Sequence, residues 1–456
     1  MKRIFLFVLL SCSWAVPLFA QDPDTLHLLQ ELIRIDTSNP PGNETSAAYL
    51  VHALLARNGI FSEVIESAPG RGNLIARLKG DGSKPAMILL GHLDVVPADP
   101  TEWQIPPFSG EIKDGEIWGR GSLDMKGMVA METEAFLRLK SQHVPLGGDV
   151  ILVLTADEEA GGREGAEFLV KNHWDKIEAK YLLTEGSVGI RKDGMNVYAI
   201  QVAEKGVAWM KITAHGTSGH GSMPEEDNAV VRLAEAVEKL AHHRFPVIKT
   251  DVLAAFLERL SGQLPFYQRL GIRLFFAPVI GPVIQRIAAH TLAKEKSIRA
   301  VLSDTISPTM LSAGYKVNVI PAEASAAIDA RILPGETPGE FLEKVRKMLG
   351  AGFDVELITG SVPNKSDFQT DYFRTVEEAL RKADGSAITA PIISAGATDS
   401  RFFREKGVTC YGIIPLLLTP EQVQGLHGKN ERIPVDQLER GTGIVYDVVK
   451  RMQALP

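Results

Sequence analysis

Residues 86–94 read AMILLGHLD, an apolar run that ends at a histidine and an aspartate. Two later stretches have the same form, VILVLTADEE at 150–159 and KYLLTEG at 180–186. Continuous apolar strands of this kind are typical of a parallel sheet with both faces covered, and the helix-like spacing at 125–140 and 164–172 supplies covering elements. The sequence therefore predicts an α/β fold in which helices sandwich a mostly parallel sheet.

A second pattern begins near residue 204 and indicates an inserted domain. Alternating strands and amphipathic helices follow one another there, which is typical of an α+β arrangement. The predicted elements are strands at 207–214 and 324–332 and helices at 228–242 and 337–349. We therefore expect a catalytic domain in two parts, 21–203 and 362–456, with an inserted α+β domain at 204–361 between them.

Residues of about 245–305 form a long insertion within this second domain. They contain helix-prone apolar stretches and no clean strand pattern. We expect helices that pack on the second domain; the alternative is an apolar surface for an acyl substrate, a partner or a membrane. The most apolar stretch, 274–284, is too short to span a bilayer.

The charge and the N-terminus restrict the partners and the compartment. A formal net charge of -7 without a long basic run excludes nucleic acid as a partner. A short basic start, the apolar run 4–10 and Ala20 predict a signal peptide at 1–20, hence export to the periplasm or the medium, with lipidation at Cys12 as the alternative. In the mature chain we expect no transmembrane span, and Cys410 as the single cysteine.

Polar residues follow the apolar strands at the edge where open α/β sheets bind ligands. His92, Glu158, Glu159 and Glu185 follow such strands, and Asp124 and His427, from separate segments, complete the candidates. Singly they are weak signals, and Asp124 before a helix resembles an N-cap. Together they form a cluster whose mutual repulsion favours a cation. Oxygen and nitrogen ligands suit zinc and admit cobalt or manganese, and two such ions that share a carboxylate can activate water against an amide.

The spacing also suggests roles around this cluster. A strand would place His92 and Asp94 on the same face, so that Asp94 can orient the imidazole. Glu158 and Glu159 are adjacent in a loop and should point in different directions. One of them can bind metal while the other stays free as a general base, and spacing leaves open which does which.

Longer stretches resemble a known family. They read GHLDVVPADPTEWQIPPFSGEIKDGEIWGRGSLDMKGM at 91–128, DEE at 157–159, TEG at 184–186, SAGATDSRFF at 394–403 and LHG at 426–428. In this order they resemble the co-catalytic zinc exopeptidases that include carboxypeptidase G, carboxypeptidase S, aminoacylase and succinyl-diaminopimelate desuccinylase. The resemblance covers essentially the whole mature chain and is nearest the carboxypeptidase S and secreted N-acyl-amino-acid hydrolase branch.

The resemblance implies two Zn2+ ions, with Co2+ or Mn2+ as alternatives. Their implied ligands are His92 and Glu185 on one ion, Glu159 and His427 on the other, and Asp124 between them. The resemblance further implies that Glu158 is the general base and acid and that Asp94 supports His92. The inserted domain would be of the lid or dimerisation type.

Further residues are assigned through the same resemblance. Within SGHGSMP at 218–224, His220 would polarise the scissile carbonyl, often from the second subunit of a dimer. Asn318 would lie near the oxyanion, Arg331 would bind the substrate carboxylate, and Gly396 would line the pocket. The chemistry of Arg331 agrees, since a guanidinium can hold a carboxylate through two parallel hydrogen bonds. The long insertion leaves a homodimer possible but open.

The predicted function is metal-dependent hydrolysis of an amide or peptide bond next to a free carboxylate. Such an enzyme would be a metallocarboxypeptidase or an N-acyl-amino-acid amidohydrolase, with a dipeptide or an N-acyl amino acid as its small-molecule substrate. The alternatives are an aminopeptidase or dipeptidase of the same architecture and a catalytically silent metal-binding protein. A free Glu158 beside the metals argues against the silent protein, because a binder needs no general base.

Overall fold

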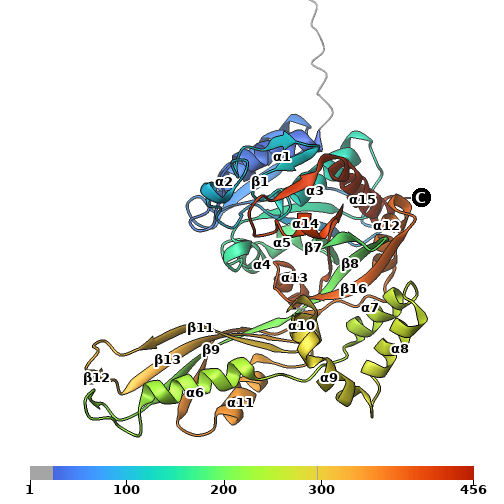
Figure 1. Cartoon of the computed structure of the whole chain (residues 1–456). Coiled ribbons are helices and arrows are strands. Elements are labelled where there is room, and N and C mark those ends of the chain that lie inside the picture. Colours follow the sequence, from blue (N-terminus) through green and yellow to red (C-terminus); the bar gives the residue numbers. More distant parts are fainter. Residues whose placement is uncertain (1–23, 295, 456) are drawn as a thin grey trace, which may run out of the picture.

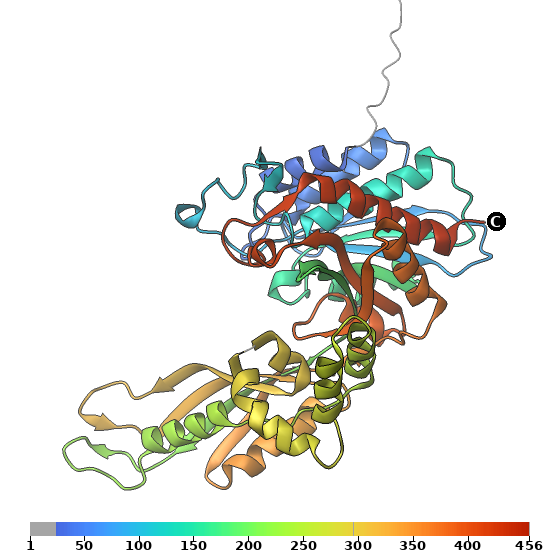
Figure 2. The same cartoon turned by 45° about the vertical axis from the view of Figure 1, so that its right-hand side comes forward.

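The computed structural model describes residues 24–294 and 296–455 (Figure 1, Figure 2). The predicted signal peptide and Cys12 lie outside the described residues. Within the described part of the chain, no helix has both the length and the hydropathy that a membrane crossing needs.

A nine-stranded sheet forms the centre of the larger body in the described residues. In spatial order its strands are β1 (Ser62–Glu66), β2 (Gly72–Leu78), β6 (Val150–Thr155), β3 (Met87–His92), β7 (Tyr181–Lys192), β17 (Thr409–Leu418), β8 (Met195–Glu204) and β15 (Asn364–Lys365), with β16 (Ala387–Ser394) beside β8. The pairs β6–β3, β3–β7, β7–β17 and β8–β16 are parallel, whereas β1, β2 and β15 pair in antiparallel fashion. The predicted α/β fold with a mostly parallel sheet is confirmed.

Helices cover both faces of this sheet (Figure 1). On one face lie α1 (Thr25–Arg34), α2 (Glu44–Arg57), α3 (Lys126–Ser141), α12 (Asp371–Ala383) and α15 (Val435–Gln453), and on the other α4 (Ala166–Asn172), α5 (Trp174–Ile177) and α13 (Ser400–Glu405). Alternate residues of one strand enter different cores: Leu89 packs with the first set, and Ile88 and Leu90 with the second. This two-sided burial explains why the strands are apolar without interruption.

A four-stranded antiparallel sheet extends away from the larger body (Figure 2). Its strands are β11 (Thr305–Ala313), β13 (Glu323–Ile332), β9 (Gly206–His215) and β14 (Phe353–Ser361), and α6 (Ala229–His242) and α11 (Pro338–Leu349) pack on it around a separate core. In β9 the buried positions alternate with more exposed ones, as its sequence pattern predicts. The domain limits 21–203, 204–361 and 362–456 stay predictions.

The insertion is helical, as predicted. It consists of α7 (Asp251–Ser261), α8 (Phe266–Phe275), α9 (Gly281–Lys294) and α10 (Lys296–Leu302). The expectation that it packs on the second domain is wrong for α7, which lies against β16 of the large sheet. Val252 of α7 belongs to the core of the larger body. The reason is that β16 is an edge strand with apolar side chains that would otherwise face water.

Candidate metal centre

Two groups of ionisable side chains meet at the edge of the large sheet. His92, Asp124 and Glu185 form the first group, and Asp124, Glu159 and His427 form the second. Within each group the potential ligand atoms lie within 4.8 Å of one another. Asp124 belongs to both groups, which is the arrangement that two neighbouring metal ions with one shared ligand require.

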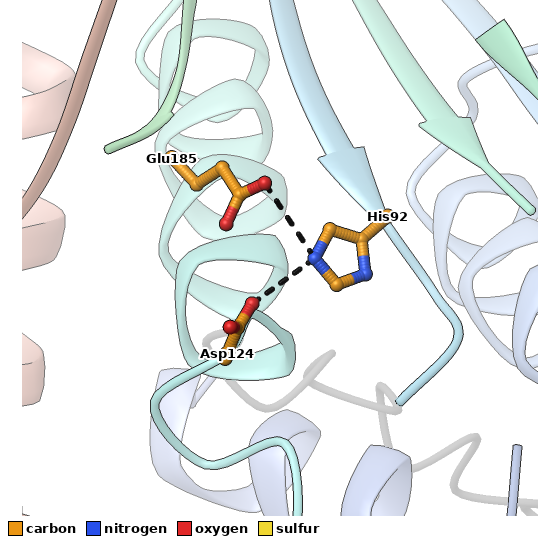
Figure 3. A group of neighbouring side chains, drawn as sticks. All are labelled: His92, Asp124 and Glu185. Carbon is orange, nitrogen blue, oxygen red and sulfur yellow. Dashed lines mark hydrogen bonds and ion pairs between the residues drawn. The ribbon is translucent and has the colours of Figure 1, made fainter. Parts of the chain in front are cut away.

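His92 anchors the first group at the end of β3 (Figure 3). Its Nε2 lies 3.1 Å from Oδ1 of Asp124 and 3.7 Å from Oε1 of Glu185. Because β7 runs parallel to β3, the end of β3 and Glu185 reach the same edge of the sheet. Asp124 precedes α3 but is not its N-cap, since the helix begins at Lys126 with Met125 as the capping residue. The carboxylate of Asp124 is therefore not used in helix capping.

His427 completes the second group from a turn close to the C-terminal strand. Its Nε2 lies 3.0 Å from Oδ2 of Asp124 and 3.3 Å from Oε2 of Glu159. The backbone of His427 has a φ of 56°, in the left-handed region. The two oxygens of Asp124 thus face different histidines, one in each group.

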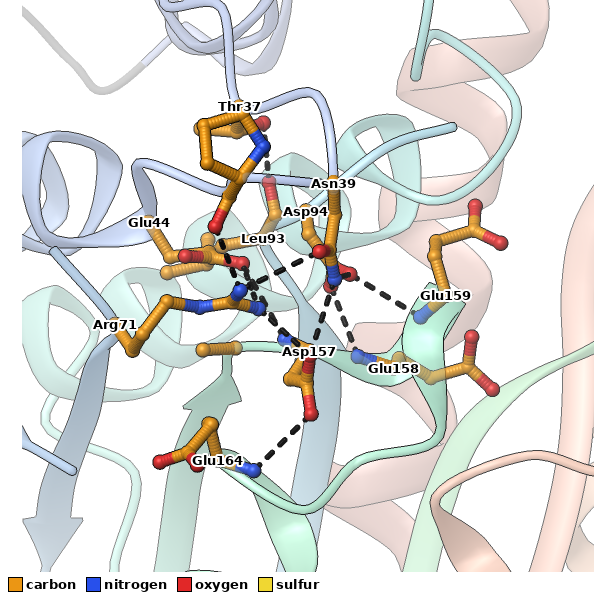
Figure 4. A network of polar contacts seen from close by, with 12 residues as sticks. Thr37, Asn39, Glu44, Arg71, Leu93, Asp94, Asp157, Glu158, Glu159 and Glu164 are labelled. Atoms are coloured by element: carbon orange, nitrogen blue, oxygen red, sulfur yellow. Dashed lines mark hydrogen bonds and ion pairs between the residues drawn. The ribbon is translucent and has the colours of Figure 1, made fainter. Parts of the chain in front are cut away.

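Asp94 holds the parts of the site together, but not in the way that strand alternation predicts. Strand β3 ends at His92, so Asp94 lies beyond it. Its backbone carbonyl lies 3.0 Å and its Oδ1 3.4 Å from Nδ1 of His92, which leaves Nε2 directed at the metal groups. The carboxylate also accepts the backbone N–H groups of Glu158 and Glu159, both at 3.1 Å (Figure 4). One buried aspartate therefore positions the histidine and both glutamates.

Glu158 and Glu159 begin a short 3-10 helix, Glu158–Ala160, after a left-handed residue, Asp157. Both line the cleft described below, but Glu159 faces His427, whereas Glu158 belongs to neither metal-ligand group. Burial and the neighbouring Glu185 raise the pKa of Glu158 well above its usual range. A carboxylate with a raised pKa can accept a proton near neutral pH, so Glu158 has the electrostatics of a general base.

The charges of the two groups favour a cation. Burial and Asp124 raise the pKa of Glu185 to about 7. Hydrogen bonds to Asp124 and Glu159 raise the pKa of His427 to about 10. Oε1 of Glu159 is buried without a hydrogen-bond partner among the described residues. Divalent cations would satisfy this oxygen and compensate the crowded carboxylates, so the residues fit a two-metal site.

Several residues of the site were not singled out by their sequence pattern. Asn39 donates to Asp94 at 2.8 Å (Figure 4), and none of the motifs that indicate the site includes it. Glu431 accepts the backbone N–H of Leu123 at 2.7 Å and of Asp124 at 3.1 Å, and so fixes the approach to the bridging aspartate.

The loop with Gly396 is fixed by another buried carboxylate. Glu204 accepts hydrogen bonds from the Thr398 backbone N–H at 2.8 Å, from the Ser400 hydroxyl at 2.5 Å and from the Arg404 guanidinium at 2.5 Å. Gly396 itself is exposed at the cleft. The carboxylate of Glu204 thus links the end of β8 to the loop. This link joins residues almost 200 positions apart, so no local sequence motif predicts it.

A cleft of about 1220 Å³ opens over the two groups. Its floor includes Glu158, Glu185 and His427, and its opposite wall includes Trp209 and Arg331 of the four-stranded sheet. The Arg331 guanidinium lies over the Trp209 ring, 5.9 Å from its centroid. Nε and Nη2 of Arg331 donate to Asp329 at 2.8 and 3.2 Å, which orients the guanidinium and leaves Nη1 outside this pair.

His220 and Asn318 do not line this cleft. His220 lies in β10 (Gly219–His220), which pairs with β12 (Val319–Ile320) next to Asn318. Strand β12 is at the end of the four-stranded sheet that is farthest from the larger body (Figure 1). Within one chain, the structure thus separates these two residues from the metal-ligand groups.

The fold and the two ligand groups define the class of metal-dependent hydrolases. Residues 88–451 match the model of peptidase family M20/M25/M40, and the chain therefore belongs to this family. It is a metal-dependent hydrolase of peptide or linear amide bonds.

Curated relatives cover most of the chain. Human N-fatty-acyl-amino acid synthase/hydrolase PM20D1 is 30% identical over 387 residues, 81% of this chain and 75% of the relative. Probable carboxypeptidase S-like 2 of Dictyostelium discoideum is 28% identical, over 84% of this chain and 74% of its own length. Mouse aminoacylase-1 is 26% identical, over 96% and 98%.

Solved structures share the fold. The M20 metallo-carboxypeptidase Sso-CP2 of Sulfolobus solfataricus superposes with a TM-score of 0.69 at 20% identity, over 94% of this chain and 98% of that one. The YXEP protein of Bacillus subtilis, a dinuclear metal-binding peptidase, gives a TM-score of 0.56 at 14% identity, over 93% and 96%. At these identities the likeness concerns the fold alone.

Proposed function

We propose that the chain hydrolyses the amide bond of N-acyl amino acids or dipeptides whose carboxylate is free. The observation that carries this proposal is that one cleft contains the two metal-ligand groups, Glu158 and, on its opposite wall, Arg331. A guanidinium across from a hydrolytic centre is suited to hold a carboxylate beside the scissile bond. The names of the relatives, which include an acyl-amino-acid hydrolase, an aminoacylase and a carboxypeptidase S-like protein, support the same substrate class.

The ligands of the proposed ions are those that the family resemblance implies. His92 and Glu185 would hold one ion, Glu159 and His427 the other, and Asp124 would bridge them. Two divalent cations, most simply Zn2+, would polarise the amide carbonyl and acidify the attacking water. Glu158 would take the proton of that water and pass it to the leaving nitrogen, while Asp94 keeps His92 and the Glu158 loop in place.

The test uses the purified full chain with metal analysis and a substrate panel. Prolonged dialysis against a chelator should abolish turnover, and Zn2+ should restore it at about two ions per chain. N-acetyl amino acids should be cleaved, whereas the same compounds with an amidated carboxylate should not. Equal turnover of acids and amides would refute the proposed carboxylate selection, and undiminished activity without metal would refute the metal centre.

Two further features belong to this proposal. We infer from residues 1–20 that the chain is exported, which the cellular fraction and the N-terminal residue of the mature protein will test. We also infer a dimer, in which a second chain brings His220 and Asn318 to the cleft, because these residues lie far from it within one chain. A monomeric and fully active enzyme in solution would contradict the second inference.

A further inference from the structure

A second cavity lies between the helical insertion and the larger body. Its volume is about 850 Å³, within the range of roughly 300–1,000 Å³ that is typical of ligand pockets. It is partly open to solvent, since its lining residues Gln268 and Gly271 are exposed. It shares no lining residue with the cleft over the metal-ligand groups.

The lining of this cavity is almost entirely hydrocarbon. It includes Val252, Phe256 and Leu260 of α7, Ile272 and Phe275 of α8, and Ile392 of β16. Gln268 is the only lining residue with a polar side chain among the described residues. An apolar lining of this kind cannot hold ordered water through hydrogen bonds, so the matching occupant is an alkyl chain.

Helix α8 covers the cavity without a packed core of its own. Its inward residues Gln268, Gly271, Ile272 and Phe275 follow the spacing of one helical face, yet none of the residues of α8 is buried. A side chain built on Gly271 would have no atom within 4 Å of its Cβ. The apolar face of α8 thus lines the cavity instead of packing against other side chains.

The charges around the cavity complement an anionic head group. From Arg259 to Lys294 the sequence contains no aspartate or glutamate, although the chain as a whole has a net charge of -7. The exposed residues Arg269 and Arg273 lie on α8. Nζ of Lys249 is 5.5 Å from the ring centroid of Phe276, which lines the cavity. Lys249 therefore places a cation beside the wall of the cavity, within reach of the carboxylate of a bound chain.

From this lining and this charge we propose that the cavity binds one single-chain fatty-acyl anion, separately from the metal centre. The alkyl chain would occupy the space between α7, α8 and β16, with the carboxylate near Lys249. The site is a binding site rather than a second catalytic centre. Bound ligand would replace missing packing contacts, so it should stabilise the insertion against the larger body.

Oleate is the probe, and isothermal titration calorimetry of the full chain is the measurement. We expect one saturable oleate site per chain. Gly271→Leu should weaken oleate binding at least tenfold, because the new side chain fills the cavity, whereas Gly271→Ala should leave the affinity within about twofold. Both changes favour the helix over glycine, so neither should unfold α8.

Matched controls separate this site from others. Gly443→Leu on α15, where an added Cβ likewise meets nothing within 4 Å, should bind oleate as the unchanged protein does. Glu158→Gln should also leave oleate binding intact, and N-acetyl amino acids should not displace oleate. Lys249→Glu should weaken binding of oleate but not of the uncharged oleyl alcohol.

Three outcomes would overturn the proposal. The first is an absence of saturable oleate binding, and the second is equal binding by Gly271→Leu and the unchanged chain. The third is binding to vesicles of phosphatidylglycerol and phosphatidylcholine in the absence of any oleate binding, which would assign the apolar helices to a membrane surface instead.

Discussion

At the residue scale, the proposed chemistry depends on which carboxylate can take up a proton. Burial and Glu185 raise the pKa of Glu158, and both features belong to the cleft itself. For Asp94 burial also opposes ionisation, but the hydrogen bonds with His92 and Asn39 lower its pKa. The two acidic residues therefore suit different roles. Glu158 can accept and release a proton, whereas Asp94 keeps its negative charge.

Glu158→Gln should abolish most of the activity and retain the metal. Gln keeps the shape of the side chain but cannot accept a proton, and general acid–base transfer contributes roughly 10²–10⁴-fold to the rate. We expect kcat to fall by that factor for an N-acetyl amino acid, with unchanged metal content by mass spectrometry. Loss of the metal in this variant, or unaltered kcat, would contradict the role of Glu158.

Arg331→Lys should affect acids and amides differently. The guanidinium is held by Asp329 and lies over Trp209, and a lysine cannot reproduce its bidentate geometry. A hydrogen bond to a charged group contributes about 1.5–3 kcal/mol, so KM for a free-carboxylate substrate should rise about tenfold or more. Residual hydrolysis of the amidated compound should stay the same; an equal loss for both would assign Arg331 to structure alone.

Sequence patterns predicted the contents of the site better than its geometry. His92, Glu159 and Glu185 follow predicted apolar strands, whereas Asp124 precedes a predicted helix and His427 is indicated by the LHG motif. The contact of Asp94 with both His92 and the Glu158 loop was not predictable, since it depends on how the chain turns after β3 ends. The support from Asn39 and Glu431 involves long-range contacts, which no local pattern encodes.

At the scale of elements, Lys205 fixes the passage between the two sheets. It follows β8 and is almost completely buried, and its Nζ donates to the carbonyls of Ala300 and Ser303 at 3.0 and 2.9 Å. It thus joins the end of the helical insertion to the strand that enters the four-stranded sheet. Burial lowers the pKa of Lys205 to about 8.

This shift predicts a pH dependence of stability that Lys205→Met should remove. Between pH 10.5 and 8 the amine of Lys205 becomes protonated in the unfolded chain but stays largely neutral in the folded chain. The free energy of unfolding therefore decreases as the pH falls from 10.5 to 8, relative to its value above pH 10.5, where the amine is neutral in both states. The difference in unfolding free energy between the native chain and Lys205→Met should change by at most roughly 3 kcal/mol across this window. Urea unfolding at several pH values measures it, and a constant difference would contradict the shift.

Strand prediction succeeded where both faces of the sheet are buried and failed at its margins. Strand β16 was not predicted, because Pro391 interrupts its pattern. Proline is tolerated there since β16 pairs with β8 on one side only, which leaves its other edge free of sheet partners. The packing of α7 on β16 depends on the same exposed edge, so it was not predicted from the sequence either.

At the scale of the whole molecule, His220 and Asn318 are separated from the cleft within one chain. Local motifs indicate these residues, but the direction in which the four-stranded sheet extends depends on the whole packing of the chain (Figure 2). The proposed dimer resolves the separation if each cleft takes these residues from the other subunit.

A mixture of two inactive variants tests this directly. Glu158→Gln and His220→Ala should each be nearly inactive alone. If His220 acts across the interface, a re-associated equal mixture should regain about a quarter of the native activity, because half of the dimers are hybrids and each hybrid has one complete site. Sizing by light scattering confirms the dimers; mixed dimers without activity would show that His220 does not act across the interface, and full activity of His220→Ala alone would place it outside the reaction.

The backbone leaves the large sheet after Glu204 and returns at Asn364, and these two residues pair directly with each other. The two points at which the chain leaves and re-enters the large sheet are therefore neighbours on adjacent strands. The four-stranded sheet between them can be exchanged for another module without a change of register in the large sheet, provided that the cover that α7 gives to β16 is kept. Variation of the segment would then alter what the enzyme accepts while the hydrolytic half of the molecule is inherited unchanged.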